Sequence, residues 1–219
     1  MIWLKSVGAR LLDLIYPRTA VCMGCGSAAG MEQPWLCPDC RAALARRWVG
    51  AFPEPKLDGA AAAYAYHGPA GGVVRRMKYD GVKGLAEMMA DDMLRAYERI
   101  LPTGAELVTA VPMHHKRLKE RGFNHAEVLA KAVAVRLELP CENVIVRTRN
   151  TVQQARLEGE ERLNNLKDAF EADGSVQGRR ILLVDDVYTT GETARECAAA
   201  LRAAGARSVS FLSYAKGGK

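Results

Sequence analysis

The sequence has no run of apolar residues that approaches the ~20 residues needed for a membrane-spanning helix. It also has no long polar tract, no internal repeat and no low-complexity segment, which argues against a disordered or repetitive chain. Hydrophobic residues make up 49% and charged residues 26% of the chain, as in ordinary globular proteins. The 219 residues therefore favour one main domain with a small appendage, and the net charge of +6 weakly favours anionic partners.

A phosphate-binding loop of the form G-x-x-x-x-G-K-[ST] is also missing. This absence decides how residues 181–186 are interpreted, where an apolar run ends in Asp185 and Asp186. The same pattern ends the second nucleotide-binding strand of many ATPases, but those enzymes hold the triphosphate with the loop that is missing here. The sequence therefore argues against an ATPase.

Residues 1–17 carry apolar side chains at helical spacing and predict an amphipathic helix. Asp13 interrupts the apolar stretch and no small-residue cleavage site follows it, so a signal peptide is not indicated. A helix that docks on the rest of the protein is favoured over one that lies on a membrane surface. We expect a cytoplasmic protein with no membrane span.

Four of the six cysteines form two C-x-x-C pairs, Cys22 with Cys25 and Cys37 with Cys40, with eleven residues between the pairs. Each pair brings two thiolates to one side of a tight turn, and two pairs complete a tetrahedral shell that suits Zn²⁺. Two disulfides or four unrelated thiols are the alternatives, but a cytoplasmic location keeps thiols reduced. Because four sulfurs leave no open position for a substrate, residues 18–48 are predicted to be a zinc ribbon with a structural metal.

Three arginines follow the second cysteine pair, namely Arg41, Arg46 and Arg47, and Trp48 comes next. Zinc ribbons often contact nucleic acid or protein, so these residues are a candidate binding face. A solvated helix end, in which the arginine stems cover apolar surface, is the favoured alternative.

Residues 49–59 contain Pro53 and Pro55 and are predicted to be a linker, so the main domain is expected at 55–219. In this domain short apolar runs alternate with helical patterns. Strands are predicted at residues 60–66, 106–111, 143–147, 180–185 and 208–214, and helices at 72–78, 85–100, 124–137, 160–170 and 192–204. This alternation predicts an α/β fold with a mostly parallel sheet flanked by helices, in which ligands bind beyond the carboxyl ends of the strands.

Residues 181–184 are expected to form a central strand, buried on both faces, that ends in Asp185 and Asp186. A hydroxyl-rich turn and a helical pattern follow. Backbone N–H groups, threonine hydroxyls and a helix N-terminus suit a phosphate monoester, while two carboxylates accept hydrogen bonds from the hydroxyls of an attached sugar. The segment thus predicts a site for ribose 5-phosphate, made of Asp185, Asp186, Val187, Tyr188, Thr189, Thr190, Gly191, Glu192 and Thr193.

This segment resembles the phosphoribosyl pyrophosphate signature of type I phosphoribosyltransferases. Three further features are similar to the competence protein F family. One is the four-cysteine ribbon, and another is Val111-Pro112 followed by Arg117 and Arg121-Gly122-Phe123-Asn124. The third is the spacing within residues 147–170 of Thr151, Gln154, Leu157, Arg162, Asn165 and Phe170. Together these features cover nearly the whole chain in the order expected for that family.

By resemblance, residues 113–122 form the loop that grips pyrophosphate, and their dense positive charge suits that role. The preferred contacts are Lys116, Arg117 and Arg121, and a solvated basic loop is the alternative. The family pattern usually has Gln where this chain has His125. Residues 78–81 also fit the family pattern, and they either line the site or form a turn.

Residues 147–161 resemble the flap that closes over the site in this fold. Such a flap excludes water, which would otherwise hydrolyse an activated ribosyl donor. Its candidate contacts are Thr151, Gln154 and Arg156, and an ordinary surface loop is the alternative.

If the resemblance extends to catalysis, a nitrogenous acceptor displaces pyrophosphate from C1 of phosphoribosyl pyrophosphate, with Mg²⁺ bridging diphosphate and ribose oxygens. Asp185 and Asp186 are then the candidate catalytic residues. The resemblance also implies a role in natural transformation, with single-stranded DNA and competence-machinery proteins as candidate partners. A protein that binds the donor as a signal, or a salvage enzyme unconnected with DNA, stays open as an alternative.

Overall fold

The structure is a computed structural model, and it describes residues 21–28, 35–98, 104–147 and 169–218. The helix predicted at residues 1–17 lies outside this range. Most of the helix predicted at 160–170 does as well, and residue 170 begins a strand instead.

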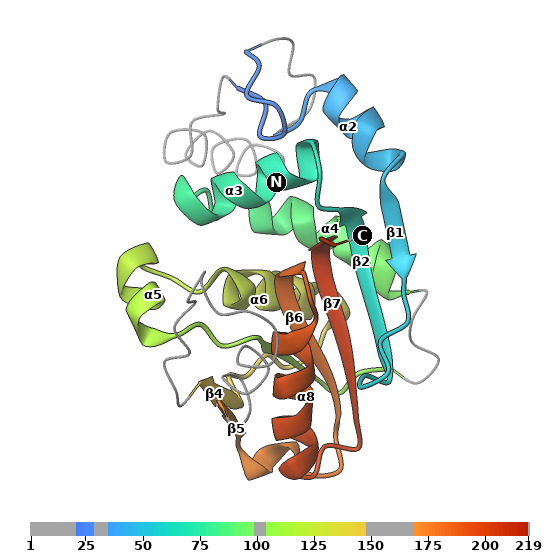
Figure 1. The fold of residues 1–219 in the computed structure, drawn as a ribbon, viewed down its shortest axis with the longest axis vertical. Helices are drawn as coiled ribbons and strands as arrows, with labels where there is room; N and C mark the ends of the chain where they lie inside the picture. The colour runs from blue at the N-terminus through green and yellow to red at the C-terminus, as the bar shows by residue number, and fades with distance from the viewer. Residues whose placement is uncertain (1–20, 29–34, 99–103, 148–168, 219) are drawn as a thin grey trace, which may run out of the picture.

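Five strands form one sheet in the order β1-β2-β7-β6-β3 (Figure 1). Neighbouring strands are parallel except for β1, which pairs antiparallel with β2. The strands are β1 (Trp48–Ala51), β2 (Gly59–Ala65), β3 (Leu107–Ala110), β6 (Arg180–Tyr188) and β7 (Ser208–Lys216). The mostly parallel sheet predicted from the sequence is therefore confirmed.

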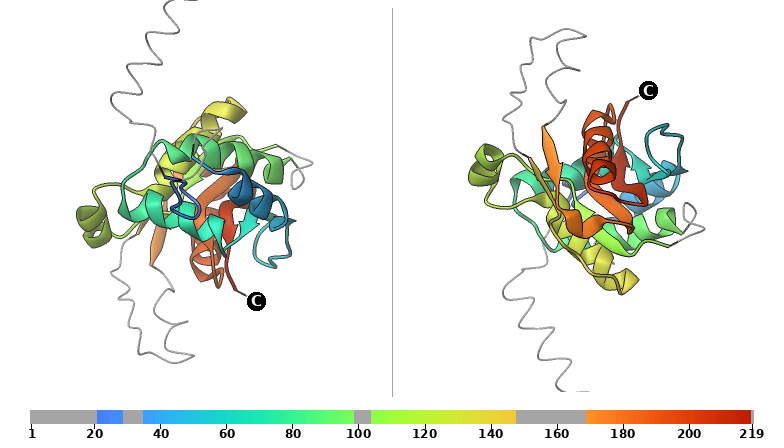
Figure 2. Two further views of the ribbon diagram at one scale, coloured as in Figure 1. Left: turned by 90° about the horizontal axis from the view of Figure 1, so that it is seen from above. Right: turned by 90° about the horizontal axis from the view of Figure 1, so that it is seen from below.

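Helices cover both faces of the sheet (Figure 2). On one face α4 (Leu85–Tyr97) contacts β2 and β7, while α6 (His125–Leu137) contacts β3 and β6. On the other face α8 (Glu192–Ala203) packs against β6 and β7. Because its two faces are both covered, β6 is apolar and buried from Ile181 through Val184, as a central parallel strand requires.

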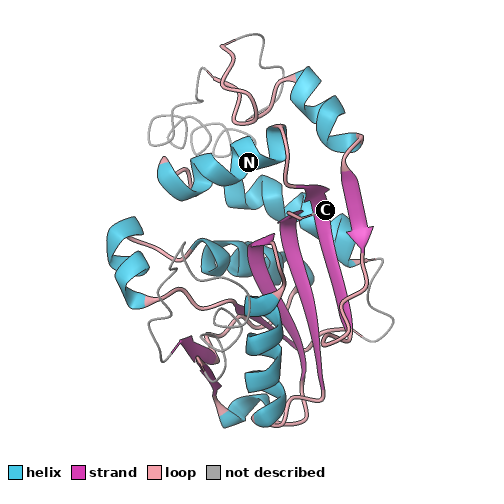
Figure 3. Ribbon diagram, viewed as in Figure 1, coloured by secondary structure: helices cyan, strands magenta, loops and turns pink. Residues whose placement is uncertain are grey.

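A further helix, α3 (Pro69–Tyr79), crosses the carboxyl-terminal end of the parallel strands (Figure 3). The four-cysteine segment and α2 (Pro38–Ala45) lie on the outer side of α3. A Cβ on Gly72 would lie 1.9 Å from the carbonyl oxygen of Gly24, so the two backbones meet where only glycine leaves room. The guanidinium of Arg76 also donates to the carbonyl of Met23 over 3.0 Å. Helix α3 therefore lies between the cysteine segment and the carboxyl-terminal end of the parallel strands.

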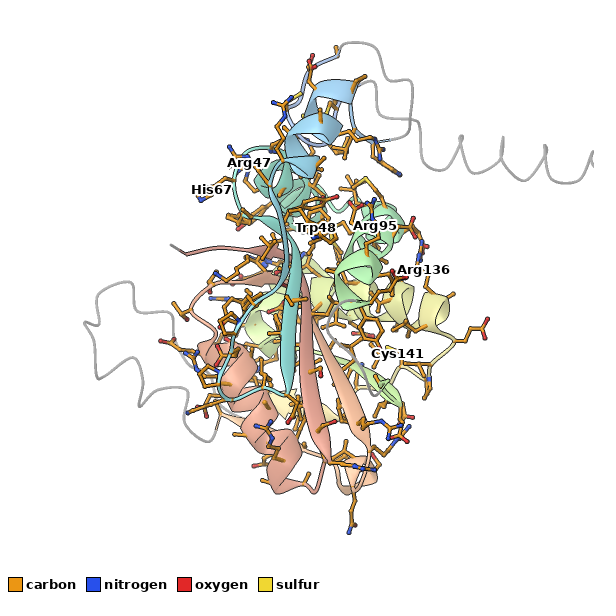
Figure 4. The ribbon with its side chains drawn as sticks, turned by 90° about the vertical axis from the view of Figure 1, so that its right-hand side faces the viewer. Arg47, Trp48, His67, Arg95, Arg136 and Cys141 are labelled. Atoms are coloured by element: carbon orange, nitrogen blue, oxygen red, sulfur yellow. The ribbon has the colours of Figure 1, made fainter. Side chains whose placement is uncertain are left out.

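The sequence predicts a linker at 49–59, and the structure corrects this because residues 48–51 are strand β1. The ring of Trp48 packs edge-on against Tyr64 of β2, with 5.7 Å between ring centroids. The guanidinium of Arg95 lies over the ring of Trp48, 6.0 Å from its centroid (Figure 4). These contacts tie the segment after the cysteines to the sheet.

Two other predictions are wrong in part. The predicted loop 113–122 contains a helix, α5 (His115–Arg121). The strand predicted at 143–147 exists as β4 (Ile145–Arg147), but it pairs with β5 (Phe170–Ala172) in a separate two-stranded sheet. A short 3₁₀ helix, Gly174–Val176, then leads to β6. Within the described part of the chain, every helix falls short of the length and apolar character needed to cross a membrane.

Candidate functional site

The acidic pair lies near the carboxyl end of the central strand β6. The sequence predicts that the strand ends at Asp185, but β6 continues to Tyr188 because β7 pairs with it as far as Lys216. Val187 and Tyr188 are therefore strand residues and not part of the turn. Asp185 and Asp186 therefore lie within the paired part of β6, shortly before the carboxyl end of the strand.

A short bend at Thr189 and Thr190 joins β6 to α8, and both threonines are exposed. The bend ends at Gly191, the residue before the helix, which has a φ of +77° and is buried. Glycine supplies no oxygen to cap the first turn, so the first N–H groups of α8 are left for another acceptor. The bend and the helix N-terminus thus form a site with the donor groups and the dipole that favour an anion. Glu192 and Thr193 are the first two residues of α8 and are half-buried.

Glu54 binds residues on both sides of this bend in the chain, Tyr188 before it and Arg195 after it. Its side chain is only 4% exposed, and its carboxylate accepts hydrogen bonds from the hydroxyl of Tyr188 and from Arg195 Nη1, the latter at 3.0 Å. Arg195 Nη2 also donates to the carbonyl of Thr190 over 2.9 Å. Burial, reinforced by the charge of Glu54, raises the pKa of Tyr188 to about 12. Neither Glu54, which falls in the predicted linker, nor Arg195 was predicted from the sequence, because no local pattern marks them.

The acid pair has a cationic partner in Lys78, which comes from the end of α3. Lys78 Nζ lies 2.7 Å from Asp186 Oδ2, and the Asp186 side chain is 8% exposed. Asp185 Oδ1 accepts a hydrogen bond from the backbone N–H of Asp186 over 2.8 Å. Burial raises the pKa of Asp185 to about 8, and the negative charge of Asp186 acts in the same direction. The ammonium group of Lys78 therefore offsets negative charge on the acid pair at short range.

His125, at the start of α6, lies behind this group and is 1% exposed. Its Nε2 lies 3.3 Å from the carbonyl oxygen of Lys78, and its ring packs at a tilt against Phe123 with 4.6 Å between centroids. Burial lowers the pKa of His125, so the ring is neutral and its Nε2–H donates to that carbonyl. His125 therefore fixes the backbone of Lys78.

The cationic residues predicted to grip pyrophosphate lie on α5. Lys116 is exposed, while Arg117 and Arg121 are half-buried. The guanidinium of Arg121 lies 5.2 Å from the ring centroid of Tyr79, the neighbour of Lys78. This contact brings α5 and the end of α3 together beside the acid pair. The predicted flap residues Thr151, Gln154 and Arg156 lie outside the described residues.

The four cysteines of the two C-x-x-C pairs come together. Their sulfur atoms all lie within 4.8 Å of one another, and Cys25 Sγ is 3.9 Å from Cys37 Sγ. Tetrahedral Zn²⁺ with bonds of about 2.3 Å requires sulfur atoms about 3.8 Å apart, so the cluster has the spacing of a zinc site. Burial raises the pKa of Cys22, but hydrogen bonds from backbone N–H groups outweigh it and lower the pKa to about 6. Burial and the neighbouring sulfur atoms raise the pKa of Cys40 instead, so it is the spacing of the four sulfur donors that fits a metal. Arg41, Arg46 and Arg47 beside it are exposed.

The chain is similar in sequence to a known domain family and to several known proteins. The model of the phosphoribosyl transferase domain matches residues 123–218, which include the acid pair, the bend and α8. Competence protein F of Haemophilus influenzae is 29% identical over 174 residues, covering 74% of this chain and 75% of that protein. Competence protein ComFC of Bacillus subtilis is 27% identical over 199 residues, covering 86% and 80%.

DNA utilization protein YhgH of Escherichia coli is 38% identical over 111 residues, and the match spans only 49% of each chain. Among solved structures, adenine phosphoribosyl transferase from Trypanosoma brucei is 16% identical with a TM-score of 0.40, covering 80% of this chain and 68% of that one. Such a low score carries no argument about the site. The two competence proteins that match over most of their length, the matched domain and the four-cysteine cluster together support an assignment of the chain to the competence protein F family, with a phosphoribosyltransferase fold.

Proposed function

We propose that the chain binds phosphoribosyl pyrophosphate with Mg²⁺ at the carboxyl end of β6 and transfers its phosphoribosyl group to a nitrogenous acceptor. One observation carries the proposal. A buried central strand brings two adjacent acids, Asp185 and Asp186, to within one short bend of an uncapped helix N-terminus. Such a site combines donors for a phosphate with acceptors for a diol, which are the two ends of a ribose 5-phosphate.

Each part of the donor then has a proposed partner. The bend from Thr189 to Thr193 holds the 5-phosphate, and Asp185 and Asp186 accept from the ribose hydroxyls. The diphosphate lies toward α5, where the partners are Lys116, Arg117 and Arg121. The flap residues Thr151, Gln154 and Arg156 close over the bound donor and exclude water.

In the proposed reaction a nitrogen lone pair of the acceptor attacks C1 as the bond from C1 to the diphosphate oxygen breaks. The diphosphate leaves with the bonding electrons, and the acceptor nitrogen loses its proton to solvent. Bound Mg²⁺ would neutralise charge on the leaving diphosphate. The contribution of the protein is to orient the ribose and stabilise charge, and either acid is placed to stabilise positive charge on the ring.

We also propose that Cys22, Cys25, Cys37 and Cys40 hold one structural Zn²⁺, in a module at residues 18–48 that precedes the main domain at 55–219. The spacing of the four sulfur atoms supports this proposal. Because thiols stay reduced in the cytoplasm, a cytoplasmic location is part of it. Metal analysis of the purified protein is expected to give one zinc per chain, and Cys22→Ser is expected to lose it while Cys141→Ser keeps it.

Thermal unfolding tests donor binding. Donor with Mg²⁺ is expected to raise the Tm of the wild type, and the double variant Asp185→Asn with Asp186→Asn is expected to show no shift. Glu171→Gln, which neutralises an exposed acid on β5, is the control and should keep the shift. An unshifted wild type would refute the site, while release of pyrophosphate with one of a panel of nitrogenous bases would establish turnover.

A second candidate function is a donor-binding protein without turnover that contacts single-stranded DNA and competence-machinery proteins. The exposed arginines next to the cysteine cluster and the names of the relatives favour it. Saturable donor binding without pyrophosphate release would support it. Salt-dependent DNA binding that weakens when Arg41, Arg46 and Arg47 are neutralised, but not when exposed Arg207 is, would support the contact with DNA.

A further inference from the structure

Lys78 is a cation beside the acid pair of the proposed site, which would have to accept both an anionic donor and a divalent metal. Its amine pairs with Asp186 at 2.7 Å, and its side chain is 21% exposed. It comes from α3, whereas the acids come from β6 and the basic residues predicted to grip pyrophosphate come from α5. The ion pair thus joins the helix that carries the cysteine segment to the acid pair.

The position of Lys78 is fixed at two points. Its carbonyl accepts from the buried neutral His125, and its amine is held by Asp186. Burial lowers the pKa of Lys78, but the charge of Asp186, the hydrogen bond to it and the charge of Asp185 together outweigh burial and raise the pKa, so the amine stays charged. An ordinary surface ion pair is exposed and contributes little to stability. Lys78 differs because its side chain is only 21% exposed and its backbone carbonyl is held by His125.

Charge explains what such a lysine does for this site. Phosphoribosyl pyrophosphate is a polyanion, and the Asp186 carboxylate without its lysine would repel it at short range. The same bare carboxylate would attract Mg²⁺, because carboxylate oxygens are ligands that hard divalent cations prefer. The ammonium group of Lys78, held against Asp186, reverses both effects. It cancels the repulsion between the carboxylate and phosphate oxygens, and it occupies a carboxylate oxygen that a free cation would otherwise bind.

We propose that Lys78 is a donor-selecting residue, which admits the anionic donor to the acid pair and keeps free divalent cations out until they arrive bound to the donor. This inference rests on the proposed function. It adds that Mg²⁺ enters the site together with the donor and not before it. The substrate would bind as its magnesium complex, and Mg²⁺ alone would bind weakly. Asp186 keeps its remaining lone pairs for a ribose hydroxyl.

Lys78→Met separates this role from a structural one because its expected effects have opposite signs. Calorimetric titration is expected to show donor, in the presence of Mg²⁺, binding about tenfold more weakly, and Mg²⁺ alone binding about tenfold more tightly. Lys78→Arg keeps the charge and should stay close to the wild type in both titrations. The matched control is Lys83→Met, which removes an exposed lysine that lies over Phe123 and not on an acid.

The outcomes are distinguishable. Wild-type protein that binds no donor would refute the proposed function itself. Wild-type protein that binds donor, with Lys78→Met binding it equally well, would refute only the role of Lys78. If Lys78→Met weakened donor and Mg²⁺ binding alike, the lysine would be a structural residue and the inference would fail.

A measurement on the wild type covers the case in which Lys78→Met does not fold. In protein labelled with ¹³C-lysine, the Cε resonance of Lys78 is identified as the one lost in Lys78→Arg. It is expected to shift when donor with Mg²⁺ is added and to stay in place with the same concentration of Mg²⁺ alone. An equal shift with Mg²⁺ alone would overturn the proposal.

Discussion

Tyr188 donates its hydroxyl hydrogen to the carboxylate of Glu54, a residue 134 positions earlier in the chain. The same buried carboxylate holds Arg195, so one acid fixes the strand end and the helix that flank the bend. We expect Glu54→Gln to lower the free energy of unfolding by about 2–4 kcal/mol in urea titration, because Arg195 loses its charge partner. Glu142→Gln, whose exposed pairing with Arg179 spans 3.8 Å, should change it by less than about 0.5 kcal/mol. Equal losses in the two variants would contradict this role.

Gly191 and Gly178 form a matched pair for testing the bend. Both have positive φ, +77° and +73°, but a Cβ on Gly191 would lie 2.2 Å from the Tyr188 hydroxyl, while one on Gly178 meets nothing within 4 Å. Gly178→Ala is expected to cost about 1–2 kcal/mol of unfolding free energy through backbone strain alone. Gly191→Ala is expected to cost at least about 2 kcal/mol more, because Tyr188 and Arg195 must move. Chemical denaturation measures both, and similar costs would show that the bend tolerates a side chain.

The contact between Gly72 and Gly24 predicts how the cysteine segment is attached. We expect Gly72→Ala to push the segment off α3, since the added Cβ would overlap the Gly24 carbonyl. Limited proteolysis should then cut faster near residues 46–58, while the zinc content stays at one per chain. Gly174→Ala, where the new Cβ has open space, is the control. An unchanged cleavage rate in Gly72→Ala would mean that the segment does not depend on this contact.

Asp185 gives a pH dependence with a defined sign. Burial and the neighbouring charge raise its pKa to about 8 in the folded protein, against 3.8 for the ordinary carboxyl group. Between these values the folded state binds the proton and the unfolded state does not, so the contribution of Asp185 to stability falls as pH rises from about 4 to 8. Asp185→Asn removes this titration. Its stability relative to the wild type should therefore increase over that range and then level off, which unfolding titrations at several pH values would measure; a constant difference would contradict the raised pKa.

The pattern of apolar runs predicted the parallel core because each central strand is buried on both faces and therefore reads as a continuous hydrophobic segment, as in Ile181 to Val184. The cysteine spacing predicted a cluster whose four sulfur atoms do come together. In both cases the residues that form the feature lie close together in the sequence. The proposed roles of the acids, the bend and α5 stay predictions.

Features that depend on distant partners could not be predicted. The four residues of β1 lie next to two prolines and become a strand only because β2 offers an edge and Tyr64 a surface for Trp48. The end of β6 at Tyr188 depends on how far β7 extends. Glu54 shows no local pattern, and its role arises from burial against Tyr188 and Arg195. Long-range pairing of this kind leaves no periodicity in the sequence.

The strand order has a consequence for how the protein is made. The strand synthesised last among these five, β7, occupies the middle of the sheet and separates β2 from β6. Until the ribosome releases it, the first two strands and the pair β3–β6 have no common neighbour, so the sheet exists as two unjoined halves. Completion of the sheet must therefore wait until β7 has been synthesised, and nascent chains stalled before residue 208 should be far more sensitive to protease than chains that contain β7.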